Sequence, residues 1–287
     1  MRHAVTALTM ALATVVAANA QQGGRFSARV DVVRVDVLVT EGGKPVQGLT
    51  ASDFELRDNG VLQQVEVADP DTTPVNAILA LDLSASVEGE RLTHLRQAGH
   101  ALLGALAPGE QASLVAFNHQ VTLESDLTAN LAAVGTALDR AGTDGRTSLI
   151  DAVYTSLIVG ESDAGHSLVL AFSDGQDTAS WLTATRVVDI GKRGFAVVYG
   201  VSVRNAGSVG DDKFMRDVTT ATGGSVIEVE STRNLSAEFV RILNEFRHRY
   251  LLRYSASGVS RTGYHKLEVR VKGRNVKIKA RPGYQAG

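Results

Sequence analysis

The chain has 287 residues, of which 44% are apolar, enough for one large domain with a small one or for two moderate domains. It has no cysteine, which excludes disulfides, thiol chemistry and a lipid-modified cysteine anchor. The net charge is −2, but residues 241–287 carry 12 Lys and Arg against 2 Asp and Glu.

This basic end has two readings. It can mark an anionic partner, or it can place Lys and Arg on solvent-facing and edge strands, where they discourage aggregation. We favour the second reading and expect no nucleic-acid partner, because no aromatic platform and no nucleic-acid-binding motif accompanies the charge.

Residues 1–20 have the order of an export signal. Arg2 and His3 form a basic start, residues 4–17 are mainly apolar, and Ala18-Asn19-Ala20 is an A-x-A cleavage site. The apolar stretch at residues 4–17 is short for a membrane-spanning helix, which needs about 20 apolar residues. We therefore expect a cleaved signal, no membrane span afterwards, and a periplasmic or extracellular location. An uncleaved anchor is the alternative.

Residues 28–74 are predicted to form a small all-β segment. Apolar residues alternate along residues 28–40, and Asn59-Gly60 is a strong signal for a tight hairpin turn. Residues 70–74 are predicted to be a linker. The predicted strands are 28–40, 46–49, 54–56 and 61–67.

From residue 75 to 249, strand and helix patterns alternate. This order favours an α/β domain with a doubly wound, mainly parallel sheet covered on both faces. The predicted strands are 77–81, 113–117, 121–124, 168–172, 195–201 and 225–229. The predicted helices are 88–106, 131–141, 148–159, 184–192, 212–221 and 234–247.

Residues 250–287 return to β structure, with strands predicted at 250–254, 264–271 and 276–281. A few short strands at either end of the chain are marginal alone. We therefore expect residues 28–74 and 250–287 to pair as one β module, with the α/β domain inserted between its halves.

Asp82-Leu83-Ser84-Ala85-Ser86 directly follows the first apolar strand of the α/β region. Its carboxylate and two hydroxyls are hard oxygen ligands, which suit Mg²⁺, Mn²⁺ or Ca²⁺ rather than zinc or copper. Thr147 precedes a predicted helix, and Asp174 follows a predicted strand. Taken singly, each piece also fits a helix cap or a turn.

In chain order these residues read D-x-S-x-S…T…D, which resembles the metal-ion-dependent adhesion site of von Willebrand factor type A domains. The resemblance covers roughly residues 75–249. It implies direct coordination of Mg²⁺ by Ser84 and Ser86, with Asp82, Thr147 and Asp174 alternating between direct and water-bridged roles. It also implies that a carboxylate of a partner protein completes the metal shell. The flanking β segments resemble those of exported bacterial proteins with such domains.

One departure from the family pattern is Arg146, where glycine is frequent before the threonine. A cation there could disfavour metal or attract an acidic ligand. Two nearby residues each allow two interpretations. Asp177 either steers metal-bound water or has a role in a helix start or a turn. Trp181 is either an exposed contact residue or a buried ring.

The leading hypothesis is a non-catalytic, exported binding module that captures a partner's Asp or Glu carboxylate through Mg²⁺. One alternative is a metal-assisted hydrolase, which needs a general base that no motif supplies here. The other is an envelope scaffold whose metal is purely structural.

Overall fold

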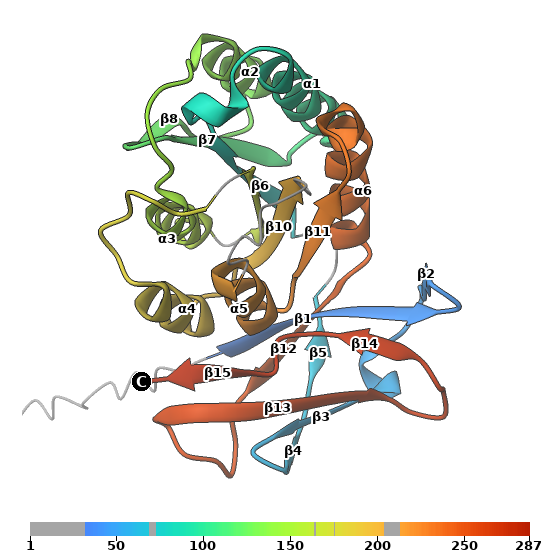
Figure 1. Ribbon diagram of the computed structural model, residues 1–287. Coiled ribbons are helices and arrows are strands. Elements are labelled where there is room, and N and C mark those ends of the chain that lie inside the picture. The colour runs from blue at the N-terminus through green and yellow to red at the C-terminus, as the bar shows by residue number, and fades with distance from the viewer. Residues whose placement is uncertain (1–31, 69–72, 164, 175, 204–212) are drawn as a thin grey trace, which may run out of the picture. The chain divides into compact units, whose positions relative to one another are not determined.

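The computed structural model describes residues 32–68, 73–163, 165–174, 176–203 and 213–287 (Figure 1). The predicted export signal at residues 1–20, residues 28–31 of the first predicted strand, and residues 70–72 of the predicted linker lie outside this part of the chain.

A six-stranded sheet runs through residues 75–229 in the order β11-β10-β9-β6-β7-β8. All neighbouring strands are parallel except β8, which pairs antiparallel with β7. Every residue of β6 is buried, as expected for a central strand covered on both faces. The strands are β6 (Val75–Asp82), β7 (Gln111–Phe117), β8 (Val121–Thr128), β9 (His166–Ser173), β10 (Val197–Val203) and β11 (Ser225–Val229).

Helices pack on both faces of this sheet. Side chains of α1, α2 and α6 join one apolar cluster, and those of α3, α4 and α5 join the other (Figure 1). In α1, Leu95, Ala98 and Leu102 recur at helical spacing, so one face of the helix meets the sheet. The helices are α1 (Glu90–Ala105), α2 (Leu131–Arg140), α3 (Leu149–Gly160), α4 (Ala184–Arg193), α5 (Lys213–Thr222) and α6 (Leu235–Arg247). None of the described helices is both long and apolar enough to cross a membrane.

Two further sheets are built from both ends of the described chain. Their orders are β14-β1-β12-β5, with β2 on β1, and β15-β13-β3-β4. Val32 of β1 lies opposite Ser255 of β12, and Asp58 of β3 lies opposite Leu267 of β13, so each sheet needs both chain segments. A shared apolar cluster includes side chains from both sheets. The strands are β1 (Val32–Glu41), β2 (Lys44–Pro45), β3 (Phe54–Asp58), β4 (Val61–Gln63), β5 (Glu66–Val67), β12 (Tyr250–Ser255), β13 (Gly263–Val271), β14 (Lys277–Lys279) and β15 (Gly283–Ala286).

Several predicted boundaries are wrong. Residues 46–49 are not a strand, residues 61–67 divide into β4 and β5 in different sheets, and β15 was not predicted. Helix α1 begins at Glu90 instead of residue 88, because Gly89 has a φ of 77°, which is outside the helical region. The predicted hairpin turn at Asn59-Gly60 is confirmed, with φ values of 47° and 83°.

A buried polar cluster lies beside this hairpin. Asp58 has no exposed surface, and its Oδ1 lies 2.7 Å from His265 Nδ1. Its Oδ2 accepts hydrogen bonds from the hydroxyls of Tyr254 and Tyr284, both at 2.9 Å. These partners come from β13, β12 and β15, so one carboxylate joins strands of both flanking sheets.

Two arginines of the basic end are buried, which corrects the expectation that its cations face solvent. Arg281 donates to the carbonyl oxygens of Gly191 and Gly194 at 2.8 and 2.7 Å, at the end of α4. Arg249 donates to the carbonyl oxygen of Gly223 at 2.6 Å, just past the end of α5. The last carbonyls of a helix lack intrahelical donors and carry partial negative charge, so both arginines stabilise helix ends.

Gly223 has a φ of 85°, which glycine adopts readily. A Cβ atom there would lie 2.6 Å from the backbone nitrogen of Arg281. This position therefore requires glycine both for its conformation and for the close approach of the C-terminal segment.

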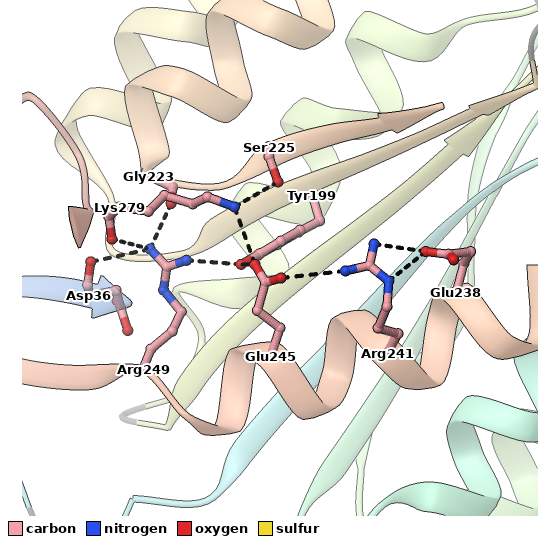
Figure 2. Close-up of polar contacts among 9 residues, drawn as sticks. All are labelled: Asp36, Tyr199, Gly223, Ser225, Glu238, Arg241, Glu245, Arg249 and Lys279. Atoms are coloured by element: carbon pink, nitrogen blue, oxygen red, sulfur yellow. Dashed lines mark hydrogen bonds and ion pairs between the residues drawn. The ribbon is translucent and has the colours of Figure 1, made fainter. Parts of the chain in front are cut away.

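Figure 2 shows how Arg249 continues into a polar network. It donates to the Tyr199 hydroxyl at 2.9 Å, and this hydroxyl donates to Glu245 at 2.8 Å. Lys279 also reaches Glu245, at 3.3 Å. Burial alone would raise the pKa of Glu245, but the hydrogen bonds from Tyr199 and Lys279 lower it overall. The carboxylate therefore stays charged between the cations of α6 and β14.

Candidate metal centre

The candidate metal centre lies where two neighbouring strands of the six-stranded sheet end. Asp82 is the last residue of β6, and Asp174 directly follows β9, the adjacent parallel strand. The strand order reverses here, because β7 and β8 lie beyond β6 while β10 and β11 lie beyond β9. Sheets of this kind bind ligands outside the carboxyl ends of the strands at such a reversal.

Asp82 is fully buried at this edge. Its Oδ1 accepts a hydrogen bond from the Ser84 backbone N–H at 2.9 Å, and its Oδ2 accepts one from the Ser173 hydroxyl at 2.6 Å. Burial raises the pKa of the Asp82 carboxyl despite these hydrogen bonds, and the charge of Asp174 raises it further. A cation beside this carboxylate would stabilise its charged form, and a bound metal ion would supply that charge.

Three further oxygen atoms form a close chain. The hydroxyl oxygens of Ser84 and Ser86 are 2.9 Å apart, and the Ser86 hydroxyl donates to Asp174 Oδ1 at 2.7 Å. Adjacent ligands of an octahedral Mg²⁺ at 2.0–2.1 Å are about 2.9 Å apart. Ser84 and Asp174 are buried while Ser86 is exposed, so the chain runs from the interior to the surface. The oxygen chemistry of these side chains fits a small hard cation.

Thr147 reaches the same edge from the loop before α3. The backbone of this loop is joined to the Asp82–Ser86 segment by hydrogen bonds from Ala85 N to Gly145 O at 3.2 Å and from Asp144 N to Leu83 O at 2.9 Å. Thr147 is buried, and α3 begins two residues later. Asp82, Ser84, Ser86 and Asp174 are thus linked through side-chain contacts, whereas Thr147 is linked to them through backbone.

Arg91 is a residue of this site that sequence reasoning missed. Its Nη1 lies 2.6 Å from Asp174 Oδ2 and also donates to the Ser86 carbonyl oxygen at 3.2 Å. Arg91 is the second residue of α1 and is 83 residues from Asp174 in the chain. No sequence signal pairs two residues so far apart, and only the adjacency of α1 to the end of β9 makes the contact.

Asp177 lies beside the start of α3, and the Trp181 side chain is at the surface, so the expectation of a buried Trp181 ring is wrong. Asp177 Oδ1 accepts hydrogen bonds from the Ile150 N–H at 3.2 Å and from the Ser180 hydroxyl at 2.5 Å, so it supports the start of α3. The Trp181 side chain is 93% exposed. Across the described ranges, no group of three or more His, Asp or Glu side chains could hold a metal, so this centre depends on its hydroxyls.

The sequence of residues 77–176 matches the von Willebrand factor type A domain. Among curated proteins, inter-alpha-trypsin inhibitor heavy chain H1 of Bos taurus is 21% identical over 223 residues, covering 72% of this chain and 25% of that protein. A UPF0353 protein of Mycobacterium leprae is 25% identical over 216 residues, covering 65% of this chain and 64% of that protein. The chain therefore spans less than two thirds of the length of either relative.

Solved structures show the same fold. A von Willebrand factor type A protein from Catenulispora acidiphila has a TM-score of 0.58 at 14% identity, covering 87% of this chain and 65% of that one. Proximal thread matrix protein 1 from the mussel byssus, with a zinc-occupied MIDAS motif, has a TM-score of 0.55 at 14% identity, covering 65% and 49%. The α/β part thus has the von Willebrand factor type A fold, which generally serves adhesion or protein interaction, mostly without catalysis.

Proposed function

We propose that this chain is an exported, metal-dependent protein-binding module. Asp82, Ser84, Ser86, Thr147 and Asp174 would hold Mg²⁺, and the ion would capture an Asp or Glu carboxylate of a partner protein. The observation that carries the proposal is the chain of oxygens from Ser84 through Ser86 to Asp174, spaced 2.9 and 2.7 Å apart.

The burial and charge of the five side chains indicate a different role for each part of the centre. Asp82 is held in place by Ser84 N–H and the Ser173 hydroxyl, so it fixes the base of the centre. Ala85 and Ser86 are exposed, so a partner side chain approaches from that side. Three of the five ligands are neutral hydroxyls, and Arg91 already pairs with one of the two carboxylates, so the protein charge would not fully compensate a divalent cation. When bound, the cation supplies the positive charge that attracts a carboxylate.

Magnesium is proposed because all five side chains offer hard oxygens, with Mn²⁺ and Ca²⁺ as substitutes. The zinc in the mussel protein belongs to a site of the same type in that protein, so Zn²⁺ joins the metals to be tested. Export is proposed from the sequence pattern of residues 1–20.

Calorimetry with Mg²⁺, Mn²⁺, Ca²⁺ and Zn²⁺ tests the metal, and short aspartate-containing peptides against their asparagine counterparts test the capture. We expect one saturable metal site per chain, with peptide binding that needs both metal and carboxylate and is lost in EDTA. Absence of saturable binding at millimolar metal would refute the centre. Metal binding without capture would point to a structural metal, and metal-dependent peptide cleavage to a hydrolase.

Arg91→Gln is expected to tighten Mg²⁺ binding, because Arg91 occupies Asp174 Oδ2 and adds a repelling positive charge. The Arg91 side chain is 41% exposed, so its ion pair is partly screened. Such pairs contribute up to about 1 kcal/mol, which corresponds to a gain of about two- to fivefold in affinity. Titration calorimetry measures the change.

The matched control is Arg233→Gln, since Arg233 is an exposed arginine that reaches Glu90 of the same helix only at 3.8 Å. Its affinity for Mg²⁺ should equal that of the wild type. Unchanged or weaker binding in the Arg91 variant would mean that the guanidinium does not compete for Asp174.

A further inference from the structure

Trp181 is the single tryptophan of the chain and is 93% exposed, more than any other large apolar side chain in the described ranges. Isolated exposed apolar residues are common and need no function. Trp181 differs from these because side chains fix its backbone and because its loop adjoins the candidate metal centre.

The loop that carries Trp181 is fixed by side chains of its surroundings. The two oxygens of the Asp151 carboxylate accept hydrogen bonds from the N–H groups of Trp181 and Leu182, both at 2.9 Å. The Ser180 hydroxyl accepts from Asp151 N–H at 3.1 Å and donates to Asp177 at 2.5 Å. The indole is therefore presented on an ordered backbone, which lowers the entropy lost when a partner binds.

This loop adjoins the candidate metal centre through Thr147. The Thr147 carbonyl oxygen accepts hydrogen bonds from the N–H groups of Thr178 and Ala179 at 2.8 and 3.1 Å. On the other side of Thr147, the Gly145 carbonyl oxygen accepts from Ala85 N–H, within the Asp82–Ser86 segment. A surface depression lies between these loops. It is lined by His119, Gly145, Arg146, Thr178–Ser180 and Trp181, and we refer to it as the rim.

The charge of the rim favours an acidic partner. Arg146 is exposed, and its guanidinium makes no hydrogen bond or ion pair with any described residue. The imidazole of His119 lies against Gly145, where a Cβ atom would be 2.5 Å from His119 Nδ1. Asp144 is the one acidic residue of the loop from 142 to 147. Tryptophan and arginine are each enriched among the residues that dominate protein-protein binding energy.

We propose that the rim binds a second part of the segment that the metal centre captures. The partner is an extended acidic segment of another protein: one carboxylate reaches the metal centre, a second pairs with Arg146, and an apolar side chain packs on the Trp181 indole. This inference rests on the proposed function and adds the partner's chemistry to it. It also gives Arg146 a role, as the cation that receives an acidic ligand.

The test uses an array of short synthetic peptides, each with one fixed aspartate whose neighbours are varied among acidic, apolar, basic and glycine residues. The full chain is applied in Mg²⁺ and in EDTA. The strongest binders should combine a second acidic residue with an apolar one. For these, Trp181→Ala and Arg146→Ala should each weaken binding by about tenfold or more. Because Trp181 is the only tryptophan, its emission should shift to the blue on binding, as the indole leaves water.

The matched controls are Leu62→Ala, an exposed apolar residue of β4, and Arg261→Ala, an exposed arginine between β12 and β13. Neither should change the affinity. EDTA-sensitive binding that Trp181→Ala and Arg146→Ala leave unchanged would overturn the role of the rim and keep the metal-dependent function. Absence of any peptide binding would overturn both the metal-dependent function and the role of the rim. Binding that survives EDTA and is still lost in Trp181→Ala would overturn the metal-dependent function and support peptide binding by the rim.

Discussion

Asp174→Ala is expected to abolish divalent-cation binding while the fold persists. The substitution removes the acceptor of the Ser86 hydroxyl and one of the two carboxylates of the centre. Arg91, which loses its partner, is 41% exposed on its side chain and can turn to solvent. We expect Mg²⁺ to raise the stability of the wild type by about 2.7 kcal/mol at a hundredfold excess over Kd, and to leave the variant unchanged. Thermal unfolding with and without Mg²⁺ measures both.

Two further variants serve as comparisons for Asp174→Ala. Ser84→Ala should weaken the same binding, since it removes a neutral ligand and keeps both carboxylates. Asp139→Ala removes an exposed carboxylate that pairs with His100 on the protein surface, and it should keep the full response to Mg²⁺. If Asp174→Ala still gained stability from Mg²⁺ as the wild type does, the ligand assignment would be wrong.

Asp58→Ala is expected to destabilise the chain severely. The Asp58 carboxylate is fully buried and accepts hydrogen bonds from Tyr254 and Tyr284, with His265 at 2.7 Å. Its removal takes this partner from the buried Tyr254 and His265 side chains and from the partly buried Tyr284 hydroxyl, and opens a cavity between strands of both flanking sheets. Each buried polar group left without a partner costs about 1–3 kcal/mol, so the loss is a large part of the stability of a typical domain. Urea unfolding followed by circular dichroism measures the loss.

Glu55→Ala provides the comparison from the same strand. Glu55 pairs with Arg57 at 2.9 Å on a partly exposed face of β3, and such surface pairs contribute less than about 1 kcal/mol. A loss for Asp58→Ala no greater than that for Glu55→Ala would show that the buried cluster does not hold the two sheets together. Asp58→Asn, which keeps one acceptor oxygen, should fall between the two.

The sequence could predict what depends on local order. Apolar runs and helical spacing located most strands and helices of residues 75–249, because burial on one or both faces leaves a periodic record. The five candidate ligands could be named because Asp82, Ser84 and Ser86 lie within five consecutive residues, Thr147 and Asp174 each lie beside a predicted element, and their order resembles a family pattern.

Contacts between distant segments left no such record. Arg91 meets Asp174 only because α1 begins beside the end of β9. Arg281 lies in the basic segment whose cations were expected to face solvent, yet it is buried against carbonyl groups at the end of α4. Asp58 directly precedes the Asn59-Gly60 turn, and no local pattern marks it as a buried residue. Its hydrogen-bond partners Tyr254, His265 and Tyr284 lie 196, 207 and 226 residues further along the chain.

The pairing of the chain's two ends has a consequence for the order of assembly. β1 takes its neighbours β12 and β14 from the last forty residues, and β3 takes β13. A ribosome, or any machinery that delivers the chain residue by residue, releases β1 and β3 long before their partners exist. Contacts so distant in sequence slow folding, because the entropy cost of closing a long loop comes before the contacts stabilise the chain. Strands β14 and β15 complete one flanking sheet each, and Arg281 between them bonds the end of α4, so these contacts form only after residues 277–286 have been released.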